Sequence, residues 1–498
     1  MKINFRSVFS GALLLVMIIS LFNCKKDNSI IVKPNPVVIK DTSIVNRFIF
    51  YGLKDYYLWK DQIPNLVAGK YDIKDSLNVL LNSYNDPQKF FADLLYKYNT
   101  VDKWSFLVND STEISNWIQG ISETMGYDFM LQRIGTAGDI FGFVRYVYKN
   151  SPAEKAGIKR GDLFMKVNDT QLTVTNYQPL LLNTKTYKLS LASIAANTIS
   201  LNGNSVTMTA VTMQENPILL DTTFMADNYK VGYLVYNGFN ADFDLQLNDV
   251  FKKFKDAAIE KLILDLRYNG GGSVQTAKYL ASMIYGTATN SVFFKSAYNK
   301  GLQDYIVSID GPSSLSENFT DKILATSTTA QTAINSVNLT SLYVITSDNT
   351  ASASELLING LLPYMQVFSV GINTAGKYVA SWTIKDWDAN GVVNPRNPYA
   401  MQPIVVKIAN SNGVSDYISG LAPNFSMEED IANLMPLGDP NETLLKPILN
   451  KIKGLPLTAI ALRSKQLGLI KVADSKSQRP FSHDMYTNKP ENLKFNFK

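Results

Sequence analysis

The chain has 498 residues, of which 46% are hydrophobic and 18% are charged, and its formal net charge is +5. This length exceeds that of one ordinary domain, and the composition is that of a globular protein, so we expect several folded domains. No run of lysines or arginines concentrates the positive charge, which argues against nucleic acid as a partner.

The first residues have the pattern of an export signal. A positively charged start precedes an apolar stretch that is too short to span a membrane but fits a secretory signal. Cys24, the only cysteine of the chain, follows in "LFNC", which resembles a bacterial lipobox. We therefore predict a lipoprotein signal peptide over residues 1–23, a lipid on Cys24, and a tether over residues 24–41. A plain signal peptide with an incidental cysteine is the alternative.

A lipid on Cys24 would attach the protein to a membrane without a spanning helix. The resemblance to a lipobox therefore implies a protein of the cell envelope, anchored at the outer membrane and facing either the periplasm or the surface. A chain with a single cysteine forms no intramolecular disulfide.

Residues 42–115 have the pattern of a small helical domain. The segment "TSIVNRFIFYGLKDYYLWKDQIP" spaces apolar residues at helical intervals and predicts an amphipathic helix from Thr42 that ends before Pro64. The segment "DPQKFFADLLYKYN" predicts a second helix over residues 86–99. Neither segment carries residues with obvious chemistry.

A β-rich domain is predicted over residues 120–213, with a strand over 141–147 and a helical turn over 153–156. The run "SPAEKAGIKRGDLFMKVN" resembles the most recognisable segment of PDZ domains. The resemblance implies that a peptide adds a strand to the sheet edge and that backbone amides hold its terminal carboxylate. A hairpin and helix without a binding role is the alternative. By the same resemblance the carboxylate-binding loop would be "GYDF", that is, Gly126, Tyr127, Asp128 and Phe129.

Residues 225–450 alternate between predicted strands and helices. The segment "KLILDLRYNGGG" reads as a buried strand that ends in a glycine run, and "SLYVITSDNT" reads as another strand, each followed by a helix. Such alternation implies parallel strands, with a site formed by the loops at their carboxyl ends. The predicted fold class is therefore multidomain α/β. Residues 451–498 form a C-terminal tail, either a strap across the core or a disordered segment.

Ser352 is the candidate nucleophile, in "NTASASELLINGLLPY" at the start of a predicted helix. Amide groups and the helix dipole favour developing negative charge at this place, although a serine there is more often only a cap. His483, the only histidine, lies in the polar tail, so a Ser-His-Asp triad would have to recruit it from outside the core. Lysine is the natural remaining base, and Lys377 in "NTAGKYV" follows after one helix and one strand.

Three motifs, in this order after a PDZ-like segment, match one family closely. The motifs "DLRYNGGG", "SASE" and "GK" together resemble those of the carboxyl-terminal processing, or tail-specific, serine proteases. The resemblance implies a ClpP/crotonase-like α/β protease core with an inserted PDZ-like domain and a small N-terminal helical domain. It assigns Ser352 as nucleophile, Lys377 as general base, and the amides of Gly271 and Ala353 as the oxyanion hole.

Further residues could support this site. Glu355, one helical turn after Ser352, either orients the lysine or satisfies the helix N-terminus. Ser381 stands where several relatives have a glutamine that positions the lysine, and its hydroxyl could bond the ammonium. Asp265 and Arg267 are expected to brace the glycine run rather than to do chemistry.

These residues predict a serine endopeptidase that cleaves exported or unfolded proteins near their C-termini, through a Ser/Lys dyad and an acyl-enzyme, while the PDZ-like domain engages substrate tails. A lysine base needs a pKa of roughly 7–8 against about 10.4 for free lysine, so we expect Lys377 to be enclosed. No metal or organic cofactor is expected, because histidine and cysteine clusters are missing. The alternatives are a non-catalytic peptide-binding lipoprotein and a crotonase-like thioesterase or hydratase, whose fold also holds an oxyanion on glycine-loop amides.

Overall fold

The computed structural model describes residues 41–67, 69–136, 138–326, 329–388, 392–459, 461–476, 482–489 and 493. All of them fall within one contact unit, residues 39–498. The predicted signal peptide, the lipid on Cys24 and the tether up to residue 40 lie outside the described residues. Within the described ranges, no helix is long and apolar enough to cross a membrane.

The N-terminal part of the described chain is helical. Its elements are α1 (Asp41–Tyr56), η1 (Lys60–Gln62), α2 (Lys74–Ser83), α3 (Pro87–Asp93) and α4 (Ser111–Ile118). The predicted amphipathic helix is α1, which ends ahead of Pro64 and buries Phe48, Ile49 and Leu53 in the largest hydrophobic core.

Two features of this helical part differ from the sequence-based expectation. The helix expected over residues 86–99 ends at Asp93 in α3, because Lys97 and Asn99 take φ angles of 45° and 64°, which a right-handed helix does not contain. Helix α2 was not predicted, because a buried Asn78 and an exposed Val79 obscure its apolar period.

The β-rich part is a sheet with strand order β25-β3-β4-β5-β7-β8, to which β6 adds beside β5. Its strands are β3 (Tyr127–Ile134), β4 (Ile140–Val147), β5 (Leu163–Val167), β6 (Thr170–Gln171), β7 (Thr186–Ala195), β8 (Thr198–Thr209) and β25 (Leu469–Asp474). The predicted strand and helical turn are β4 and α5 (Pro152–Lys155), and Ser151 caps α5 by accepting from the Glu154 amide. A π-helical turn, η2 (Gln178–Leu182), precedes β7, and β2 (Ile121–Thr124) pairs separately with β9 (Val211–Gln214).

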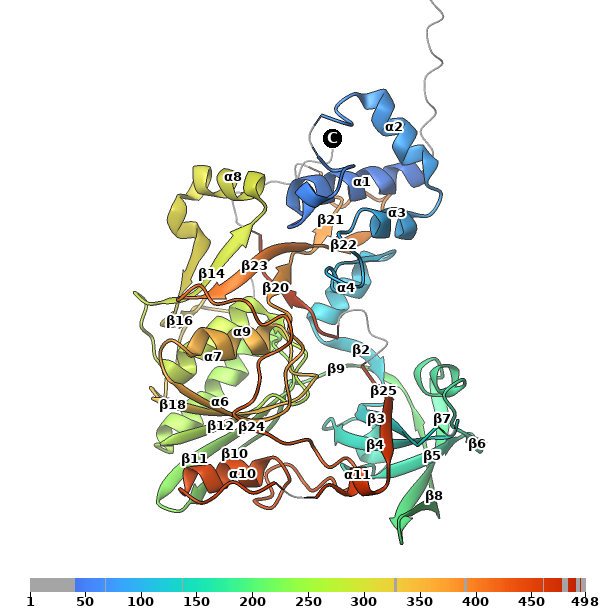
Figure 1. Ribbon diagram of the computed structural model, residues 1–498, viewed down its shortest axis with the longest axis vertical. Helices are drawn as coiled ribbons and strands as arrows, with labels where there is room; N and C mark the ends of the chain where they lie inside the picture. Colours follow the sequence, from blue (N-terminus) through green and yellow to red (C-terminus); the bar gives the residue numbers. More distant parts are fainter. Residues whose placement is uncertain are drawn as a thin grey trace, which may run out of the picture. The chain divides into compact units, whose positions relative to one another are not determined.

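The edge of this sheet is formed by the C-terminal part of the chain. Strand β25 follows α11 (Arg463–Gln466) and pairs antiparallel with β3, so that Leu469 lies opposite Ile134 and Asp474 opposite Met130. Figure 1 shows β25, in red, beside the cyan β3 and β4. Over these residues the predicted tail is an ordered strand of the sheet.

The α/β core is built on a sheet with strand order β10-β11-β12-β18-β19-β24. Its strands are β10 (Ile218–Ala226), β11 (Tyr229–Tyr236), β12 (Lys261–Asp265), β18 (Ser341–Thr346), β19 (Gln366–Gly371) and β24 (Phe425–Ser426). Strands β11 to β24 are parallel, as the alternating pattern predicts, and β10 pairs antiparallel with β11.

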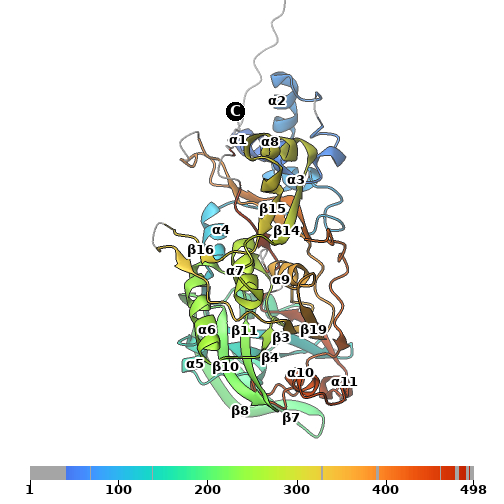
Figure 2. The same cartoon turned by 90° about the vertical axis from the view of Figure 1, so that its left-hand side faces the viewer.

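Helices cover both faces of this core sheet. Its helices are η3 (Ala241–Phe243), α6 (Asp244–Asp256), α7 (Val274–Tyr285), α9 (Ala353–Leu361) and α10 (Leu445–Ile452). Leu262 and Leu264 of β12 pack in the same hydrophobic cluster as α6, α7 and α9, whereas Ile263 packs with α10 (Figure 2). Because successive strand residues point to opposite faces, this alternation buries both faces and explains the continuous apolar runs in the sequence.

A second sheet has the order β13-β26-β20-β23-β14-β15 and brings distant segments to the carboxyl end of the core. Its strands are β13 (Gly272–Ser273), β26 (Met485–Tyr486), β20 (Val379–Ser381), β23 (Ile404–Asn410), β14 (Val292–Tyr298) and β15 (Ser316–Asn318). The remaining elements are α8 (Lys300–Asp310), η4 (Pro312–Leu315), the pair β16 (Lys322–Ile323) and β17 (Thr332–Ala333), and the small sheet of β1 (Phe106–Val108), β22 (Ala400–Gln402) and β21 (Ile384–Lys385).

Candidate active site

Ser352 lies directly before α9 in a strained conformation. Its φ angle is 68°, which is uncommon for a residue other than glycine and which persists only where the surroundings impose it. The side chain is fully buried, and its Oγ has no hydrogen-bond partner within the described ranges. A buried hydroxyl without a partner is unusual and is found where a chemical role is assigned to it. Ser352 is the N-cap residue of α9 and forms a capping box with Glu355, yet its Oγ makes no hydrogen bond of ordinary geometry in the described part of the chain.

Lys377 is also buried, with 1% of its surface exposed, which confirms the predicted enclosure. Its Nζ donates to Oδ1 of Asp484 at 2.6 Å and lies 5.2 Å from the centre of the Trp104 ring. Burial lowers the pKa of Lys377 because the charged form loses its hydration, while the Asp484 carboxylate acts in the opposite direction. The lysine is thus buried as a neutral base needs to be, while three carboxylates, those of Asp484, Asp102 and Glu355, act against the neutral form.

Glu355 joins the serine to the lysine segment. Its Oε2 accepts from the backbone amides of Ser352 at 2.7 Å and Lys377 at 2.9 Å, and its Oε1 accepts from the Gly376 amide at 2.7 Å and from the Thr374 hydroxyl. The two roles left open by the sequence are therefore combined: the carboxylate satisfies the start of α9 and fixes the backbone that carries the lysine. Burial raises the pKa of Glu355.

Ser381 does not contact the lysine ammonium, contrary to one expectation from the sequence. Its Oγ instead donates to the Asp484 carboxylate, with an Oγ–Oδ1 distance of 3.0 Å. The side-chain amide of Gln402, on β22, donates to Ser381 Oγ at 3.0 Å and to Asp484 Oδ2 at 3.1 Å. Asp484 and Gln402 were both missed, because neither stands near a recognisable motif and tertiary pairing alone brings them here.

The glycine loop, Gly270–Gly272, passes directly over Ser352. A Cβ built on Gly271, which has a φ of 108°, would lie 2.4 Å from Ser352 Cβ, so only glycine fits. The amide of Gly271 donates to Oδ1 of Asn269 at 2.9 Å and is thus not free to hold an oxyanion in this state, unlike the expectation. Ala353 is the first residue of α9, and a helix leaves its first amides without an internal acceptor.

Arg267 braces this loop, as expected. Its guanidinium pairs with the carboxylates of Asp265, Glu442 and Glu429, at 2.8, 2.7 and 2.8 Å. Asp265 ends β12 and Glu442 precedes α10, so the ion group ties the loop to the core sheet and to the segment that leads into α10.

His483 lies beside the lysine rather than in a remote tail. Its ring centre is 6.2 Å from that of Trp104, and its Nδ1 is 3.1 Å from Ser482 Oγ. Burial lowers the pKa of His483 to about 4, and the positive charge of Lys377 acts in the same direction. The imidazole is therefore neutral near pH 7, but no hydrogen bond joins it to Ser352 among the described residues.

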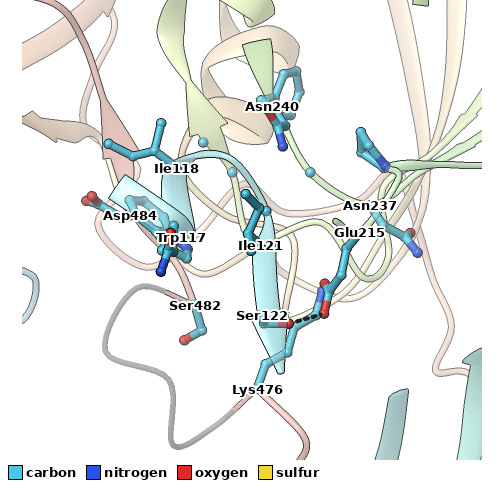
Figure 3. Close-up of a pocket in the computed structure, with 18 of the residues that line it drawn as sticks. Trp117, Ile118, Ile121, Ser122, Glu215, Asn237, Asn240, Lys476, Ser482 and Asp484 are labelled. Atoms are coloured by element: carbon cyan, nitrogen blue, oxygen red, sulfur yellow. Dashed lines mark hydrogen bonds between the residues drawn. The ribbon is translucent and has the colours of Figure 1, made fainter. Parts of the chain in front are cut away.

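A cavity of about 480 Å³ opens beside the glycine loop. Residues of α4 and β2, including Trp117 and Ile121, line one side, and the loop with Asn237 and Asn240 lines the other (Figure 3). Both polar atoms of the Asn237 side chain and the Nδ2 of Asn240 are buried and, in the part of the chain that the structure describes, have no partner. The cavity thus lies next to the glycine loop and is large enough for a small ligand or for part of a peptide.

The four residues expected to hold a peptide carboxylate are brought together at the start of β3. A Cβ on Gly126, which has a φ of 81°, would lie 2.1 Å from Ser151 Cβ, so this turn requires glycine. Tyr127 and Phe129 are buried in the domain core, and Asp128 forms a buried ion pair with Arg145. No group of three or more His, Cys, Asp or Glu side chains that could bind a metal occurs among the described residues.

Three segments of the chain match models of known protein families. Residues 230–402 match the model of peptidase family S41, residues 45–106 match the S41 N-terminal domain, and residues 143–187 match the PDZ domain. The matched residues are thus similar to an S41 peptidase and to its N-terminal domain. Along the chain, the PDZ match lies between these two matches.

Individual S41 relatives are distant. A chloroplastic C-terminal processing peptidase from Tetradesmus obliquus is 25% identical over 254 residues, 48% of this chain and 49% of that protein. A probable CtpA-like serine protease from Staphylococcus aureus is 23% identical over 243 residues, 47% of this chain and 41% of that protein. The chain thus spans about half the length of these curated relatives. The crystal structure of a putative S41 protease from Bacteroides fragilis superimposes with a TM-score of 0.63 at 25% identity, over 82% of this chain and 97% of that one.

Proposed function

We propose that this chain is a serine endopeptidase in which Ser352 attacks a peptide carbonyl and Lys377 is the general base. One observation carries the proposal: the Glu355 carboxylate binds the backbone amides of both Ser352 and Lys377. It thereby joins a strained serine whose Oγ has no partner among the described residues to a buried lysine. A neutral lysine can accept the serine proton, and burial favours the neutral form.

The reaction would proceed through an acyl-enzyme. Ser352 Oγ attacks the carbonyl carbon while its proton passes to Nζ of Lys377, and the Ala353 amide donates a hydrogen bond to the developing oxyanion. Gly271 would add a second donor once its amide leaves Asn269, an interaction often worth about 3–4 kcal/mol in the transition state. The C–N bond then breaks, the amine leaves with the proton from Lys377, and water hydrolyses the ester by the same steps.

The proposed substrates are exported or unfolded proteins, engaged by their C-terminal tails at the PDZ domain and cleaved near their C-termini. The side of β3 that pairs with β25, beside Gly126–Phe129, supports the first part, because PDZ domains bind peptides by strand addition at this position. The export signal and the cysteine of "LFNC" support an outer-membrane location through a lipid on Cys24. With that anchor the enzyme would act on proteins of the cell envelope.

The test is cleavage of fluorescein-labelled β-casein by the chain from residue 25 onward, compared with Ser352→Ala and Lys377→Ala. Both variants should lose at least about a thousandfold in kcat, as removal of a nucleophile or its base does, while their urea unfolding midpoints stay near that of the parent. Cleavage that survives in Ser352→Ala would place the nucleophile elsewhere.

A non-catalytic peptide-binding protein is the second candidate, since Lys377 bonds to Asp484 and not to Ser352. An inert parent chain that still binds peptides with free C-termini would favour it. Hydrolysis of acyl thioesters but not of casein would instead indicate the thioesterase alternative.

A further inference from the structure

The C-terminal part of the chain fills the edge of β3 in the PDZ domain. Strand β25 runs antiparallel to β3, and its carboxyl end meets the loop where the carboxyl end of a bound peptide is expected. There, the Ser475 amide donates to the Phe129 carbonyl at 3.0 Å, and the Ser475 hydroxyl donates to Oδ2 of Asp128 at 2.6 Å. Strand β25 therefore lies in the position and direction of a PDZ ligand.

A second stretch, the tail strand (residues 482–487), lies on the glycine loop. It pairs in parallel with β13, Met485 opposite Gly272, and with β20, Tyr486 opposite Ser381. A Cβ on Gly270 would lie 1.8 Å from the Ser482 carbonyl oxygen, and one on Gly271 would lie 3.0 Å from that of Asp484. An extended peptide is thus packed against the loop that covers Ser352.

The tail strand opposes the chemistry of the site in two ways. Its Asp484 accepts from Nζ of Lys377, which favours the ammonium, and an ammonium cannot take the serine proton. In addition, the tail strand packs on Gly270 and Gly271 of the loop that covers the fully buried Ser352, and so holds that loop in its closed position. Ser381 and Gln402 hold the Asp484 carboxylate in place, as described above.

We propose that residues 469–475 and 482–487 are a tethered ligand of both peptide sites and that they keep the peptidase closed until a substrate tail displaces them. The proposal rests on the proposed function, and it names the regulation of that same site. A tethered ligand competes at a high effective concentration, commonly millimolar, so short peptides displace it poorly. A longer peptide, which pairs with β3 and also takes the place of β26 between β13 and β20, should displace the tethered ligand more readily than a short one.

The first measurement is independent of catalysis. In the chain from residue 25 onward, Ser352→Cys introduces the only thiol, because Cys24 is the only natural cysteine. The rate at which iodoacetamide alkylates this thiol reports how often the buried position opens. We would compare it in the presence and absence of two further substitutions, Asp484→Asn and Gly270→Ala.

Each substitution weakens the tail strand differently. Asp484→Asn removes the charge that pairs with Lys377, and Gly270→Ala places a methyl group whose three nearest atoms belong to Ser482 and His483. The matched control is Asp416→Asn, in an exposed pair with Lys407. We expect both test substitutions, but not the control, to accelerate alkylation at least about tenfold. Unchanged urea midpoints would show that each variant keeps its fold.

Casein cleavage by the same variants with Ser352 restored separates this proposal from the proposed function. Faster alkylation with at least about tenfold faster cleavage in Asp484→Asn supports both. Faster alkylation with no cleavage by any variant would refute the peptidase and retain the tethered ligand. Equal alkylation rates in all variants would overturn the tethered ligand, and slower cleavage in Asp484→Asn would do so too, since it would make Asp484 a positioning residue for Lys377.

Discussion

Glu355→Gln is a nearly isosteric change whose cost follows from four hydrogen bonds. Every partner of the carboxylate is a donor: the amides of Ser352, Lys377 and Gly376 and the hydroxyl of Thr374. Each carboxylate oxygen accepts two of them, so a glutamine amide turns its NH2 toward two donors in either orientation. An unsatisfied buried donor costs about 1–3 kcal/mol, and we therefore expect a loss of about 2–6 kcal/mol in the free energy of unfolding.

Urea unfolding at pH 8, followed by tryptophan fluorescence, measures this loss, and casein cleavage measures its effect on the site. The control is Glu428→Gln, in an exposed pair with Lys465, which should cost less than about 1 kcal/mol. If Glu355→Gln is as stable and as active as this control, the carboxylate does not hold the serine and lysine segments together, and the reasoning fails.

Three further predictions concern charge. Burial raises the pKa of Asp244 to about 7, so between about pH 4 and 7 the folded state keeps a proton that the unfolded state has released. The free energy of unfolding therefore falls as the pH rises through that range. Asp244→Asn should raise the free energy of unfolding, measured by urea titration, by up to about 4 kcal/mol at pH 8 but hardly at pH 4. The rate of cleavage should rise with pH as Lys377 deprotonates, and the midpoint of this rise should lie below the ordinary pKa of lysine. His483→Gln should leave the midpoint unchanged. Loss of the titration in that variant would make histidine the base. Arg267→Lys should lower the free energy of unfolding by about 3–5 kcal/mol, since one ammonium cannot satisfy three buried carboxylates, and an unchanged urea midpoint would contradict this.

The sequence locates those parts of the site whose residues lie in local motifs. Ser352 and Glu355 share the first turn of α9, and Lys377 follows at the end of the next parallel strand, so local spacing and strand order bring them together. The role of Glu355 could not be chosen from the sequence, because it depends on which amides face each oxygen.

The sequence did not indicate Asp484, nor did it identify β25 and β26 as strands. These strands have six and two residues, and their pairing is decided by open sheet edges rather than by an apolar period of their own. Asp484 reaches Lys377 across 107 residues of sequence, a contact that no local pattern reveals. The sequence likewise did not predict that the Gly271 amide donates to Asn269, since this hydrogen bond depends on the side-chain rotamer of Asn269.

The position of β26 between β13 and β20 also sets an order of folding. Its partners precede it by more than a hundred residues, and the contact between Ser381 and Asp484 closes a loop of 103. Contacts of such separation form late, after the entropy of closing the loop has been offset by earlier packing. The serine, the lysine and the glycine loop can therefore assemble before the tail strand is in place. The chain would pass through an interval in which Ser352 and Lys377 are already in place and the tail strand is still unpaired.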